Sequence, residues 1–192
     1  RLREDISTIE DETRQCQRIV QELLDLARPV SSLDDDVDVA QLLRSAADRV
    51  QLFRPAIPIE AACDIPDAPP LRVRGDRDRL RQVFDNLARN AAEALPESGG
   101  RVTFRARLQK SPVSGAPDQV AIEAQDTGIG MNEEQCERIF DPFYSTKAGG
   151  SGLGLSIVYS MVQAHRGSIS VRSAPCEGAT FTVLLPAVPP PP

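Results

Sequence analysis

The chain has 192 residues, is 41% hydrophobic and carries a formal net charge of −6. A chain of this length can bury one full core, so we expect one complete domain and a piece of another. The acidic balance lacks the dense Lys/Arg run of a nucleic-acid-binding surface, and no apolar stretch reaches the length of a membrane span. Four scattered cysteines without paired spacing fit reduced thiols better than a disulfide or zinc framework. We therefore expect a soluble, cytoplasmic portion, with membrane attachment, if any, only through regions upstream.

A long helix is predicted over residues 1–30. Mostly apolar residues recur between Leu2 and Ala27 at alternating spacings of four and three, and Pro29 ends the pattern. This heptad seam favours a helix that packs in a bundle or a dimer over a solitary helix lying on the domain. Because the chain starts inside this helix, we expect a segment upstream to be missing from the sequence. Residues 31–36 are predicted to form an acidic linker.

Strands and helices then follow one another irregularly. Asp36 or Asp38 is a candidate cap for a helix through Val50, and Asp76 caps a second helix that contains two asparagines. We predict strands at residues 57–63, 101–108, 119–125, 168–172 and 179–185, a helical turn at 133–139 and a helix at 152–164. Without a regular βαβ rhythm, this order predicts an α+β fold, a two-layer sandwich in which helices cover one face of a mixed sheet. Residues 188–192 are predicted to form a Pro-rich tail.

The sequence FDNLARNAAEAL, residues 84–95, predicts one helix whose apolar residues recur every three or four positions. Asn86 and Asn90 lie four residues apart, so both side chains leave the helix on the same face. Asparagine is a mediocre helix former that prefers caps and turns. The pair therefore needs an explanation other than helix formation.

A carboxylate and two glycines form the motif DTGIG at residues 126–130, directly after the strand that ends AIEAQ. The end of a strand, where glycines let the backbone turn tightly, is a natural edge for a ligand. Asp126 can accept a hydrogen bond from the N6 amine of adenine, whereas guanine presents a carbonyl at that position. Taken alone, the motif favours a simple turn.

A second glycine cluster lies in KAGGSGLGLSIVYS, residues 147–160, at the entry to a helix. Free backbone N–H groups and the positive end of the helix dipole together cradle phosphates. The spacing fits neither a Walker loop nor the Gly-x-Gly-x-x-Gly turn of dinucleotide-binding folds. A flexible loop that eases helix packing is an equally good interpretation of this stretch alone.

Together, the asparagine-bearing helix, DTGIG, FDPFYSTK and GGSGLGLSI occur in the order of the N, G1, F and G2 boxes of a known domain. The chain thus resembles the ATP-binding domain of bacterial sensor histidine kinases, a branch of the gyrase, Hsp90, histidine kinase and MutL superfamily. The resemblance covers residues 37–186 and implies an ATP-binding catalytic domain at 37–187. The stretch ELLDLARP also resembles the second helix of the dimerisation and histidine phosphotransfer domain, which implies that residues 1–30 are its C-terminal helix.

The resemblance implies roles for individual residues. Asn90 would ligate Mg²⁺, with Asn86 near the metal and the triphosphate, and Asp126 would hold the adenine amine. Gly128 and Gly130 would let the backbone approach the base, and Thr180 would line the far side of the base pocket. The residues implied to meet the phosphates are Lys147, Gly152, Leu153, Gly154 and Leu155. Asn86, Asn90 and Lys147 are thereby implied to be catalytic, and Phe140, Phe143 and Tyr144 to pack under the lid.

Two departures from the family pattern qualify the resemblance. Many of these kinases carry a lysine three residues beyond the magnesium asparagine, where this chain has Glu93, and we assign Glu93 no catalytic role. The chain also lacks the motif of the phosphoacceptor histidine. Its only histidine, His165, lies near a helix end before Gly167, and we expect it to be structural.

The resemblance implies the ATP-binding catalytic part of a two-component sensor histidine kinase. Such a protein transfers the γ-phosphoryl group of Mg-ATP to its own histidine, dimerises through its helical domain and relays the group to an aspartate of a response regulator. One alternative is an ATPase of the same superfamily, which needs a glutamate where this chain has Asn86. A second is a non-catalytic module that senses a nucleotide or docks a partner.

Overall fold

The computed structural model describes residues 13, 16–17, 20, 24, 33, 35–66, 70–110, 117–147 and 150–188. The predicted heptad helix over residues 1–30 and the Pro-rich tail therefore lie, apart from isolated positions, outside the described residues. No helix in the described ranges combines the length and the apolar character that a membrane span requires.

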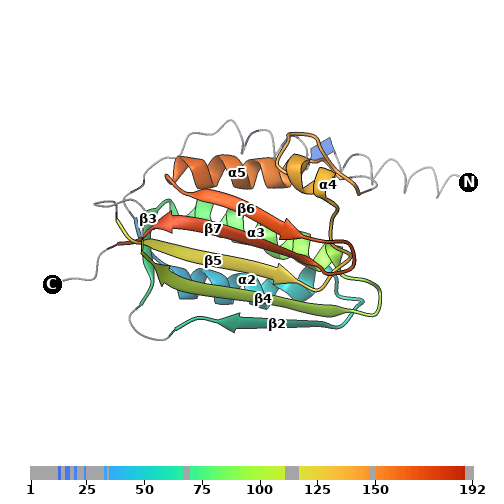
Figure 1. Cartoon of the computed structure of the whole chain (residues 1–192), viewed down its shortest axis with the longest axis horizontal. Coiled ribbons are helices and arrows are strands. Elements are labelled where there is room, and N and C mark those ends of the chain that lie inside the picture. The colour runs from blue at the N-terminus through green and yellow to red at the C-terminus, as the bar shows by residue number, and fades with distance from the viewer. Residues whose placement is uncertain are drawn as a thin grey trace, which may run out of the picture.

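Five strands form a mixed sheet in the order β2-β4-β5-β7-β6 (Figure 1). β2 runs parallel to β4, and the other neighbours are antiparallel. The strands are β2 (Ile59–Asp64), β4 (Gly100–Gln109), β5 (Gln119–Asp126), β6 (Ser168–Ser173) and β7 (Ala179–Pro186). All five predicted strands are thus confirmed, and their ends differ from the predicted ones by at most two residues.

Helices cover one face of this sheet. Figure 1 shows α2 (Val39–Phe53) and α3 (Arg77–Ala94) behind it, and α5 (Gly154–Ala164) beside β6. The short helix α4 (Glu133–Arg138) precedes α5. Side chains alternate along β4, so Val102 and Phe104 point into the helical layer and are fully buried, whereas Arg101 is exposed on the other face. Because one face of the sheet is apolar and the other polar, the predicted two-layer α+β sandwich is confirmed.

Side-chain caps fix where the helices begin. The carboxylate of Asp38 accepts a hydrogen bond from Gln41 N at 3.1 Å, and that of Asp76 accepts from Asp78 N and Arg79 N at 3.0 and 3.1 Å. Each cap satisfies backbone N–H groups that have no partner within the helix. Asp38 and Asp76 are therefore the caps that the sequence predicted.

A small second sheet was not predicted. β1 (Asp35–Asp38) pairs antiparallel with β3 (Arg72–Gly75), and Asp36 forms an ion pair with Arg72 at 2.9 Å. Asp35 and Asp36, expected at the end of an acidic linker, thus belong to a strand. Both strands are four residues long and mostly polar. β1 shows no alternation of polar and apolar residues, and the alternation in β3 is too short to identify a strand by itself.

Candidate functional site

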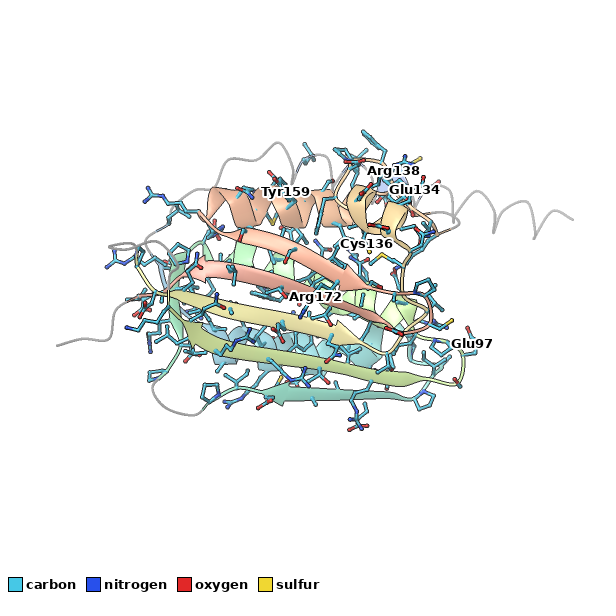
Figure 2. All side chains as sticks on the ribbon, in the orientation of Figure 1. Glu97, Glu134, Cys136, Arg138, Tyr159 and Arg172 are labelled. Atoms are coloured by element: carbon cyan, nitrogen blue, oxygen red, sulfur yellow. The ribbon has the colours of Figure 1, made fainter. Side chains whose placement is uncertain are left out.

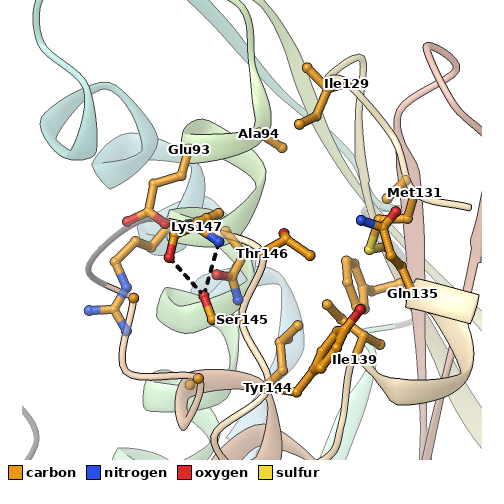
Figure 3. A pocket seen from close by; sticks show the side chains of 18 of the residues that line it. Glu93, Ala94, Ile129, Met131, Gln135, Ile139, Tyr144, Ser145, Thr146 and Lys147 are labelled. Carbon is orange, nitrogen blue, oxygen red and sulfur yellow. Dashed lines mark hydrogen bonds and ion pairs between the residues drawn. The ribbon is translucent and has the colours of Figure 1, made fainter.

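A cavity of about 480 Å³ lies between α3, the loops on either side of α4, the start of α5 and the inner face of β5 and β7 (Figure 3). It is lined by Arg89, Asn90, Glu93, Ala94, Asp126, Ile129, Gly130, Met131, Gln135, Ile139, Tyr144, Ser145, Thr146, Lys147, Gly150, Ser151, Gly152, Gly154, Leu155, Ala179 and Phe181. Ala179 N contacts Asp126 Oδ1, and the apolar Ile129 and Met131 follow Asp126 in the lining. Lys147 pairs instead with Glu93, and Arg89 Nη2 lies 3.9 Å from the Cβ position of Gly154 at the start of α5. The cavity therefore has a mainly apolar end and a polar end.

Asp126, the last residue of β5, is the buried acid of the apolar end. Asp126 is only 3% exposed, and its Oδ1 accepts hydrogen bonds from Gly128 N at 2.8 Å and Ala179 N at 3.3 Å. Burial raises the pKa of the carboxyl above its usual value of 3.8, and the two backbone donors and the charge of Lys147 act in the opposite direction. A buried carboxylate held by two backbone groups is a rigid acceptor for a donor of a ligand.

Two glycines after Asp126 let the loop pack closely. A Cβ at Gly128 would lie 2.5 Å from the carbonyl oxygen of Ala94, and a Cβ at Gly130 would lie 1.9 Å from that of Ala174. Gly130 also has a φ of +66°, a conformation that favours glycine. Gly130 lines the cavity, whereas Gly128 acts behind it by pressing the loop against the end of α3.

On α3, the two asparagines separate. Asn90 lines the cavity, but Asn86 is 7% exposed and is absent from the lining, and its Oδ1 accepts a hydrogen bond from Arg89 Nη2. Arg89 itself lines the cavity. Asn86 therefore acts on the cavity through a neighbouring guanidinium, rather than by facing a metal or a ligand directly.

Lys147 and Glu93 face each other at the polar end. Lys147 Nζ lies 2.5 Å from Glu93 Oε2, and Figure 3 shows the two side chains side by side. The departure from the family pattern at position 93 thus places a carboxylate in the cavity, where it neutralises the lysine.

The start of α5 brings glycine backbone to the same end. Gly152, Gly154 and Leu155 line the cavity. Gly152 has a φ of +69°, and a Cβ there would lie 2.4 Å from the carbonyl carbon of Phe143, so only glycine fits without rearrangement. Leu153 is fully buried in the core and does not line the cavity. Any contact from Leu153 to a ligand would have to come from its backbone.

Thr180 does not line the cavity, contrary to the expected role. Ala179 and Phe181 line it, and side chains alternate along β7, so Thr180 points to the opposite face of the sheet. It pairs there with Arg172, which lies on the open face of the sheet in Figure 2. The sequence motif located the correct strand, but the assignment was off by one residue, which reverses the face.

Sequence reasoning missed four residues of the cavity wall, Ile129, Met131, Gln135 and Ile139. Tyr144, which the sequence had singled out, lines the cavity with them, and in Figure 3 Met131, Gln135, Ile139 and Tyr144 lie across the cavity from Glu93. The expected aromatic cluster under the lid is only partly present, because Phe143 is 69% exposed. Phe140 packs edge-on against Phe181, with ring centroids 6.3 Å apart. The sequence analysis also did not identify Arg89 as a cavity residue, although its position between Asn86 and Asn90 on the helix could have indicated it.

His165 is a structural residue, as expected. It is 3% exposed, its Nδ1 lies 2.7 Å from Met161 O, and its Nε2 accepts a hydrogen bond from Asp76 N at 3.0 Å. An accepting Nε2 assigns the ring proton to Nδ1. The ring thereby joins the end of α5 to the beginning of α3.

Comparison with known proteins places these features in a family. Residues 75–189 match the model of the histidine kinase-, DNA gyrase B-, and HSP90-like ATPase family. Sporulation kinase E of Bacillus subtilis (strain 168) is 34% identical over 94% of this chain and 23% of its own length. The sensor histidine kinase ZraS of Klebsiella oxytoca is 36% identical over 91% of this chain and 36% of its own length. The chain thus spans between about a quarter and a third of the length of these curated relatives.

Solved structures of histidine kinases have the same fold. The mycobacterial sensor histidine kinase MprB aligns with a TM-score of 0.65 and 28% identity, covering 81% of this chain and 99% of that chain. Full-length ShkA in complex with AMPPNP aligns with a TM-score of 0.76 and 27% identity, covering 97% of this chain and 39% of that chain. From the match to more than half of its residues, we conclude that the chain belongs to the histidine kinase-, DNA gyrase B-, and HSP90-like ATPase family.

Proposed function

We propose that this chain is the ATP-binding catalytic part of a sensor histidine kinase and that ATP binds in the cavity beside Asp126. The observation that carries the proposal is the buried Asp126 carboxylate on the cavity wall, fixed by Gly128 N and Ala179 N. Both of these hydrogen bonds end on Oδ1, so Oδ2 is the oxygen offered to an exocyclic amine. Adenine carries such an amine at C6, where guanine carries a carbonyl.

The two ends of the cavity suit the two ends of the nucleotide. The apolar end, with Met131, Ile139 and Phe181, would enclose the flat base, and the polar end would take the triphosphate. There, Lys147 offers a positive charge, and the glycines before α5 expose backbone N–H groups at the positive end of a helix. The complex of ShkA with AMPPNP, an ATP analogue, supports this assignment.

Asn90 is the residue proposed to hold Mg²⁺. Its amide oxygen is a hard, neutral donor on the cavity wall beside the proposed triphosphate site. No group of three or more His, Cys, Asp or Glu side chains in the described ranges is arranged to hold a metal. The donor set therefore fits a Mg²⁺ ion that keeps waters and shares phosphate oxygens. When bound, Mg²⁺ would neutralise charge on the phosphates.

The family relationship supports the remaining parts of the proposal. Residues 35–187, which include β1, would form the catalytic domain. Residues 1–30 would form a helix of the dimerisation and phosphotransfer domain, residues 31–34 a linker and residues 188–192 a tail. The intact protein would transfer the γ-phosphoryl group to a histidine outside this sequence and then to a response regulator in the cytoplasm. In such a reaction the chain's own residues act by positioning ATP and by offering charge and helix-end amides, rather than by covalent chemistry.

Titration calorimetry with ATP and GTP tests the binding site. ATP should bind in preference to GTP, and Asp126→Asn should weaken ATP binding by about 1.5–3 kcal/mol, the range for a hydrogen bond that involves a charged group. Asp118→Asn is a matched control. Asp118 directly precedes β5, whose last residue is Asp126, but it pairs with Lys110 at 4.0 Å and does not line the cavity. Equal affinity for the two nucleotides would contradict the adenine assignment.

Phosphoryl transfer needs a protein with the upstream segment restored. Incubated with γ-labelled ATP, it should acquire a label that is labile to acid and stable to base, the behaviour of phosphohistidine. Nucleotide binding without such a label would instead support a sensing or docking module.

A further inference from the structure

The charged side chains that line the cavity are not all paired with one another. Among the cavity-lining residues that the structure describes, the charged ones are Arg89, Glu93, Asp126 and Lys147. Glu93 and Lys147 form an ion pair with each other at 2.5 Å, and Asp126 is held by backbone donors in the apolar part. The guanidinium of Arg89 makes no ion pair with an acidic side chain of the cavity lining. Its charge also acts on Asp85 of the same helix, but Asp85 lies outside the lining and forms its ion pair with Arg49 at 2.8 Å.

Arg89 lies where the glycine-rich entry to α5 meets α3. The position that a Cβ of Gly154 would occupy is 3.9 Å from Arg89 Nη2, so the guanidinium stands next to the first residue of α5. The carbonyl and amide groups nearby cannot supply a full positive charge, whereas a guanidinium carries one at every physiological pH. Arg89 and the helix end therefore face the same part of the cavity.

The hydrogen bond from Arg89 Nη2 to Asn86 Oδ1 sets the direction of the guanidinium. Asn86 is 7% exposed, so its amide is held by the surrounding core, and Arg89 is half-buried. An arginine anchored at one nitrogen still presents its other N–H donors, in a planar fork that matches phosphate oxygens. The buried asparagine thus has a role that does not require it to touch a ligand.

We propose that Arg89, aimed by Asn86, binds the terminal phosphates of the nucleotide and makes the site select nucleoside triphosphates over adenosine and AMP. This inference rests on the proposed ATP site and assigns its triphosphate end. Asn86 is a positioning residue in it, and Asn90 remains the proposed metal ligand. Because Arg89 would contact phosphate and not the base, its removal affects only ligands that carry the distal phosphates.

The test compares the affinities of Mg-ATP, AMP and adenosine for the wild-type chain and for Arg89→Gln. We expect Arg89→Gln to weaken Mg-ATP binding about tenfold or more and to leave adenosine and AMP affinity unchanged. Arg81→Gln is the matched control, since Arg81 is on the same helix, pairs with Asp78 at 3.5 Å and does not line the cavity. It should leave all three affinities unchanged.

Asn86→Asp tests the positioning role with little change in shape. The added negative charge would bind the guanidinium more strongly and reduce its charge toward phosphate, so Mg-ATP should bind several-fold more weakly while adenosine binds as before. Combined with Arg89→Gln, this substitution should add no further loss, because both act through one group. Thermal melting of each variant shows whether the fold is retained.

Three results would overturn the inference: an unchanged Mg-ATP affinity in Arg89→Gln, an equal loss for adenosine and Mg-ATP, or fully additive losses in the double variant. Failure of the proposed function looks different, since the wild-type chain itself would then bind neither Mg-ATP nor adenosine.

Discussion

Glu93 on α3 and Lys147 in the segment before α5 form an ion pair of 2.5 Å inside the cavity proposed to hold ATP. Both side chains are about two-fifths exposed, so the pair is screened by water and weak. A triphosphate that binds Lys147 must compete with Glu93, and the carboxylate also repels the phosphates.

We therefore predict that Glu93→Gln strengthens ATP binding by about 0.2–1 kcal/mol, the usual range for an exposed pair. The gain should shrink as salt is added, because screening already weakens the repulsion. Titration calorimetry at two salt concentrations measures both effects. Glu97→Gln is the control, because Glu97 pairs with Arg54 at 2.6 Å outside the cavity. A loss of affinity that appears only with Mg²⁺ would show instead that Glu93 orders a metal-bound water.

Binding and stability should both depend on pH through Asp126. Burial raises the pKa of this carboxyl above 3.8, against the opposing effect of its two backbone donors and Lys147, so it gains a proton earlier than an ordinary aspartate as pH falls. The protonated form is a weaker acceptor for the adenine amine. The advantage of wild type over Asp126→Asn in adenosine affinity should therefore shrink from neutral toward acidic pH, before the pH reaches the usual aspartate range.

The raised pKa of Asp126 also predicts in which direction the free energy of unfolding changes with pH. The folded state binds the Asp126 proton more tightly than the unfolded state does, so the contribution of this group to the free energy of unfolding rises as pH falls through its raised pKa. Asp126→Asn, which keeps an acceptor for Gly128 N and Ala179 N, should then be more stable than wild type at neutral pH and lose that advantage in acid. Urea unfolding at several pH values tests this, and a pH-independent difference would contradict it.

The sequence predicted those parts of the fold that local patterns determine. Helix caps such as Asp38 and Asp76 are readable because one side chain satisfies backbone groups two or three residues away. β1 and β3 were missed because their pairing joins segments that are far apart in the sequence, as in the contact of Asp36 with Arg72. A four-residue strand gains its stability from its partner rather than from its own pattern.

The same distinction applies to the cavity. Asp126 and Gly130 were predictable because motif spacing alone marks a strand end followed by a tight turn. The face on which Thr180 lies, and the pairings of Glu93 with Lys147 and of Asn86 with Arg89, depend on register and on side-chain geometry. A motif specifies which residues are nearby, whereas packing decides which of them touch the ligand.

Two cavity glycines should respond in opposite ways to alanine. Gly130→Ala should destabilise the fold by about 1–3 kcal/mol, since φ is +66° and the new Cβ would lie 1.9 Å from the Ala174 carbonyl oxygen. Gly154→Ala should be neutral or stabilising by up to about 1 kcal/mol, because its nearest contact is Arg89 Nη2 at 3.9 Å and the position is helical. Chemical denaturation measures both, and equal effects would contradict this account.

His165→Ala should destabilise the fold by about 2–4 kcal/mol. The substitution removes the acceptor of Asp76 N, deprives Met161 O of a donor and leaves a void between α3 and α5. His165→Gln, which retains both an acceptor and a donor, should lose less. If thermal and chemical denaturation show that alanine and glutamine cost the same, the two ring hydrogen bonds do not contribute to stability.

The unmodified chain should hold ATP and hydrolyse it far more slowly than the enzyme median of about 10 s⁻¹. The ATPases of the superfamily use a carboxylate to position the attacking water. At the position where the related ATPases use glutamate, this chain has Asn86, which does not line the cavity and binds Arg89, and Glu93 is paired with Lys147. Even Asn86→Glu should therefore bring little gain, because the new carboxylate would pair with Arg89.

Phosphate release from γ-labelled ATP measures turnover. The same samples should show no label on His165, which is buried with both ring nitrogens hydrogen-bonded. Rapid hydrolysis would instead place the chain with the ATPases of the superfamily, and label on His165 would require the end of α5 to open.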